Sequence, residues 1–456
     1  MKTITMSEAM DAVKYAEGCS REERLKLQKE RLRELVNYAR ENSPYIRDKY
    51  KCLPDDYDLS DIPTSSKKEI LEHYEDWVTD REVKLESIRQ YLDSEDRFER
   101  QYLDKYSALT TSGSTGNPFA MVRDSYHNTI HGALMAHRLM GENASLVDLS
   151  KNKAACLIYP DPHVSSYSSM LRMQRAQKEY ADNIIAISPL LPKEEIVRQL
   201  NDFNPDVVSC YPSVLCQIAP EKKAGNLKIN LKGIFCSAEL LTESMYENLT
   251  NIFNCPVFNN YCSTEGGEAA MASGCPHLHI NEDWVIIEPI DENGEVITSE
   301  DKWSSGILIT DLSNYVQPII RYRLDDSVRI HKNCACGNSL PYMDIHGREA
   351  LMLEFGGHSI KFTNFSFLLE DRLGTFAVQV IKKSDHLMEL RSTIPVSEGR
   401  EEYLKKAVDI LTEYLKDDGC TDFEVTMSME DPVRNKRGGK LPSYVATVAT
   451  VATECL

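Results

Sequence analysis

Residues 110–118 read TTSGSTGNP and combine hydroxyl side chains with two glycines in one short run. Such a run makes a poor helix and a poor strand, but its glycines let a loop backbone approach a ligand closely. Backbone N–H groups and hydroxyls are donors for anionic oxygens, so the loop suits phosphate. Asn117 and Pro118 follow the second glycine where P-loop NTPases have a lysine, so it is not that cradle. An ordinary surface turn is the alternative.

Two later stretches also carry residues that suit a nucleotide. Residues 259–267 (NNYCSTEGG) follow an apolar strand, and a Thr hydroxyl beside a carboxylate can meet phosphate and Mg²⁺ respectively. Residues 310–326 (TDLSNYVQPIIRYRLDD) end in carboxylates that can hold ribose hydroxyls. The alternative for Asp325 and Asp326 is a polar turn between strands.

The elements that position these stretches follow a βαβ pattern. Short apolar runs alternate with helical runs from residue 154 to residue 261, which predicts a parallel sheet covered by helices. Ligands of such sheets bind at the carboxyl ends of the strands. Before this region, apolar spacing predicts one long helix over about 22–50, and Ser66 with Glu69 predicts a capping box that opens another helix.

The sequence pattern changes after residue 268, where strand-like runs replace the alternation of strands and helices. Residues 284–289, 306–311 and 318–322 are strand-like and predict a small β-rich subdomain over about 270–345. We therefore expect an α/β fold with a large N-terminal domain, residues 1–347, that has helix-covered, mostly parallel sheets and this β-rich subdomain. A small mobile α+β C-terminal domain, residues 348–456, completes it.

Composition bounds the function. The 456 residues are 42% hydrophobic and 27% charged, which is ordinary for a globular protein. The formal net charge of −19 argues against a nucleic-acid partner. No run approaches the ~18 apolar residues of a membrane span, and no signal peptide is recognisable, so a cytoplasmic protein without a membrane partner is expected. Thirteen cysteines in such a chain suggest reduced thiols or metal ligands.

The order of the motifs carries a resemblance. TTSGSTGNP, CSAE, YCSTE, IRYRLDD, HGRE and a C-terminal Lys440 follow one another as in the adenylate-forming superfamily of acyl-CoA synthetases. The chain most resembles the phenylacetate-CoA ligase and coenzyme F390 synthetase-like branch, with LVNYARENSPYIRDKY, NPDVVSCYPS and LHINED in support.

The resemblance implies a role for each matching residue. The β- and γ-phosphates of ATP would be held by Ser112, Gly113, Ser114, Thr115 and Gly116. Thr264 would contact the α-phosphate, Glu265 would ligate Mg²⁺, and Lys440 would reach in during adenylation. The adenine would be lined by Ala238, Glu239, Asn259, Asn260 and Tyr261, and the ribose would be held by Asp326 and Arg348.

Four residues depart from the family pattern. Cys262 and Asp325 stand where the family usually has glycine, and Glu349 with Ala350 replaces the common Asp pair at the hinge. The hinge change bears on the second half-reaction more than on the first, because the small domain is thought to swing between them.

A structural zinc site is also predicted. Cys275, His279, Cys334 and Cys336 flank the β-rich unit, and three thiolates with one imidazole make a closed tetrahedral Zn²⁺ site. Relatives carry similar residues there, and His279 is preferred to His277 because it occupies the LHINED position. Plain buried cysteines are the alternative.

The expected activity is an AMP-forming acid–thiol ligase. ATP, Mg²⁺ and a small-molecule carboxylic acid would give an acyl-adenylate and pyrophosphate, and the acyl group of an aromatic or arylalkyl acid would pass to coenzyme A. An amine, a hydroxyl or a carrier protein is the alternative acceptor, and a nucleotide-binding protein without catalysis is the alternative class. A second copy of the chain and a carrier protein are the candidate protein partners.

Overall fold

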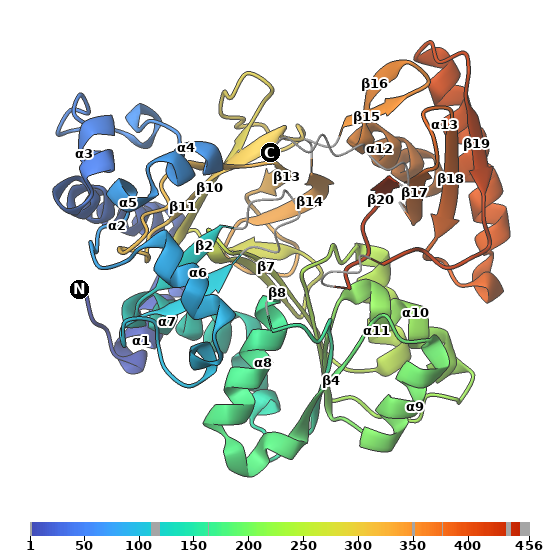
Figure 1. The fold of residues 1–456 in the computed structure, drawn as a ribbon, viewed down its shortest axis with the longest axis horizontal. Coiled ribbons are helices and arrows are strands. Elements are labelled where there is room, and N and C mark those ends of the chain that lie inside the picture. Colours follow the sequence, from blue (N-terminus) through green and yellow to red (C-terminus); the bar gives the residue numbers. More distant parts are fainter. Residues whose placement is uncertain are drawn as a thin grey trace.

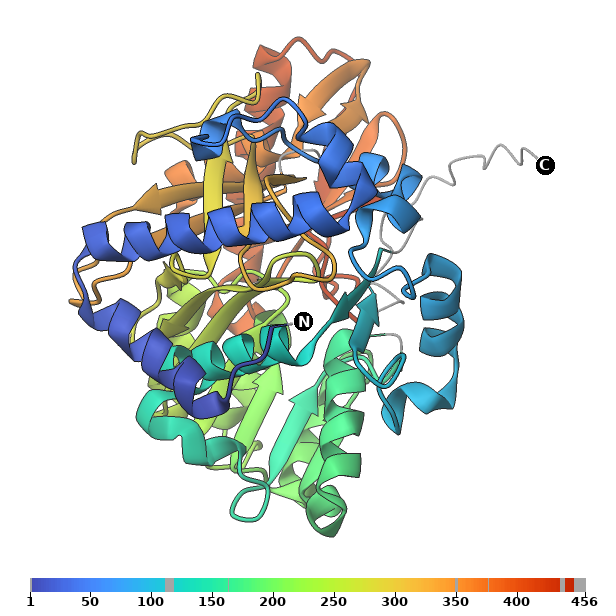
Figure 2. The same ribbon diagram turned by 90° about the vertical axis from the view of Figure 1, so that its left-hand side faces the viewer.

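The computed structural model describes residues 2–110, 119–162, 164–348, 352–375, 377–434 and 439–446. The N-terminal quarter is helical and covers one side of the molecule (Figure 1). The long helix α2 crosses the face that Figure 2 turns to the viewer. The helices of this part are α1 (Met6–Gly18), α2 (Arg21–Asn42), α3 (Pro44–Lys49), α4 (Lys67–Glu72), α5 (Tyr74–Trp77) and α6 (Leu85–Asp93).

Two predictions for this part have different outcomes. The single helix expected over about 22–50 is wrong, because the chain breaks at Ser43 and restarts with Pro44 at the first turn of α3. The capping box at Ser66 is confirmed in one half: the Ser66 hydroxyl accepts the Glu69 N–H and starts the helix, but the reciprocal bond from the Glu69 side chain does not form. The Glu69 carboxylate pairs with Lys49 at 2.6 Å, so no reciprocal capping bond is needed to satisfy it.

Within the described residues, the largest sheet holds nine strands in the order β13-β14-β9-β8-β7-β6-β5-β3-β4. The strands from β4 to β7 run parallel, as the βαβ pattern predicts, and the strands from β8 to β13 join antiparallel. The nine strands are β3 (Ala154–Leu157), β4 (Ile184–Ile187), β5 (Val207–Cys210), β6 (Gly233–Ser237), β7 (Val257–Ser263), β8 (Gly267–Ser273), β9 (Leu278–Ile280), β13 (Asp326–His331) and β14 (Tyr342–Arg348).

Helices cover both faces of this sheet. Val207 packs into a core shared with α1, α2 and α7, whereas its neighbour Val208 packs into a core shared with α9, α10 and α11. This alternation is what a strand buried on both faces requires. The covering helices are α7 (Ser125–Leu134), α8 (Ser165–Ala176), α9 (Lys193–Phe203), α10 (Pro212–Lys223) and α11 (Glu243–Phe253).

Smaller sheets flank the large one. The hairpin of β1 (Ser107–Thr110) and β2 (Ala120–Arg123) borders the TTSGSTGNP run, and β10 (Val285–Ile290), β11 (Gly306–Asp311) and β12 (Tyr322–Leu324) form a second sheet. The strand expected over 318–322 begins only at Tyr322. Arg321 has a φ of +44°, outside the extended region, and its guanidinium is held by Glu288 at 3.0 Å.

The last part of the described chain has a core of its own. Leu353, Phe365, Val380, Leu404 and Leu411 are among the buried residues that define it. This C-terminal lobe lies beside the large sheet, in orange and red in Figure 1. It consists of β15 (Met352–Phe355), β16 (His358–Lys361), α12 (Phe362–Leu373), β17 (Val378–Lys382), β18 (Leu387–Ser392), α13 (Arg400–Asp417), β19 (Glu424–Met427) and β20 (Tyr444–Ala446).

The predicted α/β fold is therefore confirmed. The predicted β-rich stretch contributes both to the large sheet, through β9, β13 and β14, and to the three-stranded sheet beside it. Among the helices of the described residues, none combines the length and apolar character that a membrane crossing requires.

Candidate functional site

The residues predicted to bind the β- and γ-phosphates, Ser112 to Gly116, lie outside the described residues. The hairpin that carries them is described on both sides, because Thr110 on β1 pairs with Ala120 on β2. At the end of β2, Arg123 Nη2 donates to the carbonyl oxygens of Ser263 at 3.3 Å and Thr264 at 3.0 Å. The base of this hairpin is thus tied to the end of β7.

The turn between β7 and β8 carries Thr264 and Glu265. Gly266 N donates to Ser263 Oγ at 2.8 Å, which closes the turn on itself. The Glu265 carboxylate is 8% exposed and meets the hydroxyl of Tyr322. Burial and this carboxylate together raise the pKa of Tyr322, so the phenol stays a donor. Carboxylate oxygens are the ligands that Mg²⁺ prefers, so a cation bound at this turn would meet Glu265.

The residues predicted to surround the adenosine meet at the ends of neighbouring strands. Ser237 of β6 pairs with Asn260 of β7, and the next residue, Ala238, has a φ of +67°. A non-glycine residue in that region is uncommon and strained, and such residues cluster at functional sites. Tyr261 Oη donates to Asp326 Oδ2 at 2.8 Å.

Successive side chains of β7 point to opposite faces of the sheet. The Asn260 amide lies 3.7 Å from Met135 Sδ, on the face covered by the end of α7, whereas Tyr261 reaches Asp326. Asn259 is 5% exposed and accepts the N–H of Asn260. Any contact that Asn260 makes on the Tyr261 side therefore comes from its backbone.

Arg348 is the last residue of β14 and pairs in register with Asp326. The two residues predicted to hold the ribose thus lie opposite each other at one end of an antiparallel pair. The hinge residues Glu349 and Ala350 lie outside the described residues.

The segment that carries Lys440 is seated on the large sheet. Leu441 N donates to Glu239 Oε1 at 2.6 Å, and the other oxygen of that carboxylate accepts Ser213 Oγ at 2.5 Å. Arg434 Nη1 reaches Ser213 Oγ at 3.1 Å and Glu239 Oε1 at 3.7 Å. A solvated basic turn was the alternative for this cluster, but the Arg434 side chain is only 8% exposed.

This seating brings Lys440 to the turn after β7. Cys262 is exposed at the end of β7, and the positive charges of Arg123 and Lys440 both act on its thiol. Cys262 is two residues from Thr264, so the ammonium acts on the same turn. Glu239, predicted to line the adenine, is engaged by the C-terminal segment in this arrangement.

Histidines that sequence reasoning missed lie directly beneath the turn. His127 and His131 are one helical turn apart on α7, and their rings stack with centroids 4.0 Å apart. His131 Nδ1 lies 2.6 Å from Glu268 Oε2, and His127 Nε2 lies 3.0 Å from Asp311 Oδ2. Their spacing of four along a helix was the available signal, but nothing local points to partners more than 130 positions away.

The predicted zinc ligands come together. The ligand atoms of Cys275, His279, Cys334 and Cys336 all lie within 4.8 Å of one another. His279 Nδ1 lies 3.1 Å from the Leu340 carbonyl oxygen, which leaves Nε2, 3.4 Å from Cys336 Sγ, as the ligand atom.

Charge and orientation agree with a metal site. Burial lowers the pKa of His279, so the ring is neutral, as a ligand must be. His277 instead faces the ring of Tyr342, with centroids 4.4 Å apart. Burial raises the pKa of Cys275 to about 12, a shift that a bound divalent cation would reverse.

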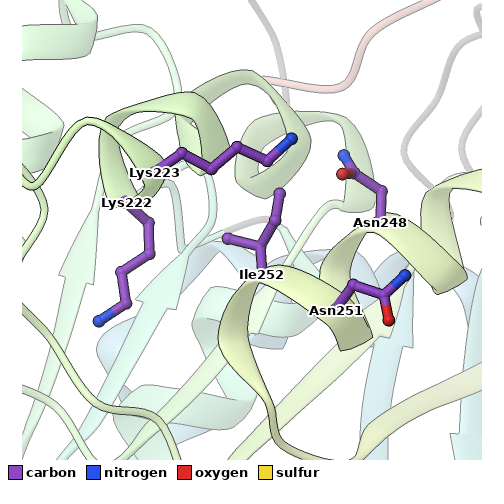
Figure 3. A pocket seen from close by; sticks show the side chains of 5 residues that line it. All are labelled: Lys222, Lys223, Asn248, Asn251 and Ile252. Atoms are coloured by element: carbon purple, nitrogen blue, oxygen red, sulfur yellow. The ribbon is translucent and has the colours of Figure 1, made fainter.

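A surface pocket of about 410 Å³ lies elsewhere, between α10 and α11 (Figure 3). It is lined by Lys222, Lys223, Asn248, Asn251 and Ile252. None of the predicted site residues contributes to it. Lys223 pairs with Glu398 of the C-terminal lobe at 3.2 Å, so this surface adjoins the contact between the lobes.

Known sequences offer two matches. No protein-family model matches the chain. The chain is 22% identical over 462 residues to a phenylacetate-coenzyme A ligase of Thermus thermophilus, and the match covers 93% of this chain and 97% of that protein. A shorter stretch of 136 residues is 28% identical to protein CapK of Staphylococcus aureus, and it covers 29% of this chain and 28% of CapK.

Solved structures share the fold. A 2-hydroxyisobutyryl-CoA ligase in the postadenylation state, in complex with 2-HIB-AMP, superposes with a TM-score of 0.65 at 16% identity, covering 94% of this chain and 91% of that one. The same ligase with 2-HIB-AMP and CoA in the thioesterification state gives a TM-score of 0.56, with the same identity and coverage.

Proposed function

We propose that this chain, which resembles the phenylacetate-CoA ligase-like branch of the adenylate-forming superfamily over nearly its whole length, is an AMP-forming acid–thiol ligase. One observation carries the proposal. The turn that holds Thr264 and Glu265, the Tyr261–Asp326 pair and the segment of Lys440 converge at the end of β7. To bind ATP, a protein needs hydrogen-bond donors and a cation near the triphosphate and a hydrogen-bond acceptor near the ribose hydroxyls, and these groups must lie close together.

The first half-reaction follows from this grouping. A carboxylate oxygen attacks the α-phosphorus of ATP, the new C–O–P linkage forms, and the bond to pyrophosphate breaks. Negative charge builds on the oxygens of the α-phosphate, and the Lys440 ammonium with the Thr264 hydroxyl stabilises it. Glu265 would hold Mg²⁺, which would supply positive charge beside the phosphate oxygens. Asp326 accepts hydrogen bonds from the ribose hydroxyls and so fixes the position of the nucleotide.

The second half-reaction transfers the acyl group. The thiol sulfur of coenzyme A attacks the acyl carbonyl, the thioester bond forms, and AMP leaves with the electron pair of the broken bond. No cysteine of the chain is required as a nucleophile. By resemblance to its branch, the substrate class is an aromatic or arylalkyl acid.

Pyrophosphate exchange tests the proposal. Labelled pyrophosphate is expected to enter ATP when an aromatic or arylalkyl acid is supplied, and thioester is expected after coenzyme A is added. A small hydroxy acid serves as the contrasting substrate. Exchange without thioester formation would favour an amine, a hydroxyl or a carrier protein as acceptor, which the altered hinge sequence keeps open. Absence of exchange with every acid would contradict the ligase assignment.

We also propose a structural zinc ion at Cys275, His279, Cys334 and Cys336. The ion would join the turn after β8 to the loop between β13 and β14, and it would stabilise the fold rather than react. We expect about one zinc per chain by elemental mass spectrometry, and a lower melting temperature after chelation. Cys334→Ser, which removes one of the four ligands, is the test variant. Cys52→Ser, at an exposed thiol outside the cluster, is its control. Negligible zinc in the purified protein would refute the site.

A further inference from the structure

Beneath the turn of Thr264 and Glu265 lies a buried charged network that none of the steps above uses. His127 and Asp311 are fully buried, and His131 is 5% exposed. Asp311 Oδ1 accepts both the N–H of Ser313 at 2.9 Å and its hydroxyl at 2.6 Å, and Ser313 Oγ lies 3.0 Å from His131 Nε2. The network links α7 to the end of β11.

The upper end of this network touches the turn itself. His131 Nδ1 lies 2.6 Å from Glu268 Oε2, the second residue of β8. A Cβ atom placed on Gly267 would lie 2.3 Å from His131 Cε1, and one on Gly266 would lie 2.2 Å from Ile309 Cδ1. Gly267 also has a φ of +62°. The turn therefore rests directly on the imidazole ring, with no room for a side chain between them.

The two histidines of this network differ in pKa because different charged groups face them. Burial opposes a charge on His131, but Glu268 and Asp311 outweigh it and raise its pKa to about 9. Burial and the neighbouring His131 lower the pKa of His127 to about 4. The charged groups that face this pair come from every side: Glu268 on β8, Asp311 on β11 and Arg123 on β2.

Both the carboxylate and the backbone N–H of Glu268 face His131 Nδ1, at 2.6 Å and 3.2 Å, so a protonated ring pairs with the carboxylate and a neutral ring accepts the N–H. Burial opposes the charge of Glu268, but His131 lowers its pKa to about 2, so this carboxylate remains ionised. Buried ion pairs of this kind add little net stability compared with apolar packing, and they fix geometry instead. The Glu268 backbone is held as well, because Asn281 Nδ2 donates to its carbonyl oxygen at 2.7 Å.

We propose that His131 is a positioning residue for adenylation, which sets the place of Thr264 and Glu265 through its ion pair with Glu268 and its contact with Gly267. The inference rests on the proposed function and adds to it. His131 would act through the turn, because its contacts are with Gly267, Glu268 and Ser313 behind it. It determines where the turn that faces them can lie.

The decisive variants are His131→Gln and Glu268→Gln, which keep size and remove the ion pair. We expect each to lower kcat of pyrophosphate exchange about 100-fold, since an error of ~1 Å in placement has that effect. The KM of the acid is expected to stay unchanged. The double variant is expected to lose no more than either single variant, because both break one interaction. His137→Gln, from the π-helical segment Met135–Met140 that continues α7 and paired with Glu17 outside the network, is the matched control.

Two further readouts separate positioning from general damage. The ion pair is present below the His131 pKa of about 9 and is lost as pH rises through it, so wild-type kcat should fall there and His131→Gln should lack that limb. Hydrogen exchange should quicken in the peptide that spans residues 261–270 of His131→Gln, at temperatures well below its melting.

The outcomes are distinct. Unchanged kcat together with unchanged exchange in this peptide would overturn the inference, and so would a loss of activity explained wholly by unfolding in both variants. If none of the acids tested supports pyrophosphate exchange by the wild-type enzyme, the proposed function fails. The hydrogen-exchange measurement on residues 261–270 still decides whether His131 fixes the turn.

Discussion

Among single residues, Lys440 has the most demanding assignment, because it comes from the C-terminal lobe and is proposed to act at a turn of the large sheet. We expect Lys440→Ala to slow adenylate formation by about 10²- to 10³-fold, the loss typical of one donor to a developing anion. ATP affinity should change little, since the charge it stabilises grows during the reaction. Rapid-quench measurement of adenylate, with ATP binding by calorimetry, checks both. Lys416→Ala, in the last turn of α13, is the control. Equal losses in rate and affinity would indicate a misfolded lobe instead.

Tyr261 supports the residue predicted to hold the ribose. Its hydroxyl donates to Asp326 at 2.8 Å, so Tyr261→Phe leaves that carboxylate without this donor. We expect the KM for ATP to rise about tenfold, equivalent to about 1.4 kcal/mol, with little change in kcat. Steady-state exchange kinetics measure this. Tyr15→Phe, at an exposed position of α1, should behave as wild type. An unchanged KM would remove Tyr261 from the site.

At the scale of elements, the contact between α10 and the C-terminal segment is held by few groups. Arg434 bonds Ser213 and lies 3.4 Å from Gln217 Oε1, so Arg434→Ala should loosen the segment from the large sheet. We expect slower adenylation and an undiminished rate of thioester formation from preformed adenylate, because only the first step needs Lys440 seated here. Single-turnover assays of the two steps distinguish them. Lys405→Ala, on the exposed face of α13, is the control. Equal slowing of both steps would contradict this assignment.

Local sequence signals predicted most elements well and failed where distant contacts decide. The βαβ alternation gave β3 to β7 and their helices because period and length are properties of each segment. Pro44 broke a helix that apolar spacing alone continues. The strand over 318–322 failed because Arg321 takes up a left-handed backbone to reach Glu288 and the carbonyls of Ser60 and Ile62.

The resemblance named residues of the candidate site that the fold brings together. Tyr261, assigned to the adenine, and Asp326, assigned to the ribose, lie in contact, and the four thiol and imidazole groups gather. Their roles stay predictions. The role of Glu239 in seating Leu441 was not predictable, because it depends on how the two lobes meet. The His131–Glu268 pair was missed for the same reason. Placement of the TTSGSTGNP run stays a prediction.

On the scale of the whole molecule, two separately packed parts should unfold separately. The C-terminal lobe has its own core, so calorimetry of the full chain should resolve a smaller transition beside a larger one. Leu404 is fully buried in that core, and Leu404→Ala should destabilise the smaller transition by about 2–5 kcal/mol and leave the larger one in place. Leu25→Ala, at an exposed position of α2, is the control. A single transition that shifts as a whole would contradict the proposed division near residue 348.

Strand β14 has a mechanical consequence. It is bonded to β13 as far as Arg348, opposite Asp326, so the backbone up to that residue cannot turn without breaking the sheet. Any pivot of the terminal lobe must therefore lie after Arg348, past the pair proposed to hold the ribose. A longer linker inserted after Arg348 would then increase the distance over which the lobe could carry Lys440, and it would leave the pairing of β13 with β14 unchanged.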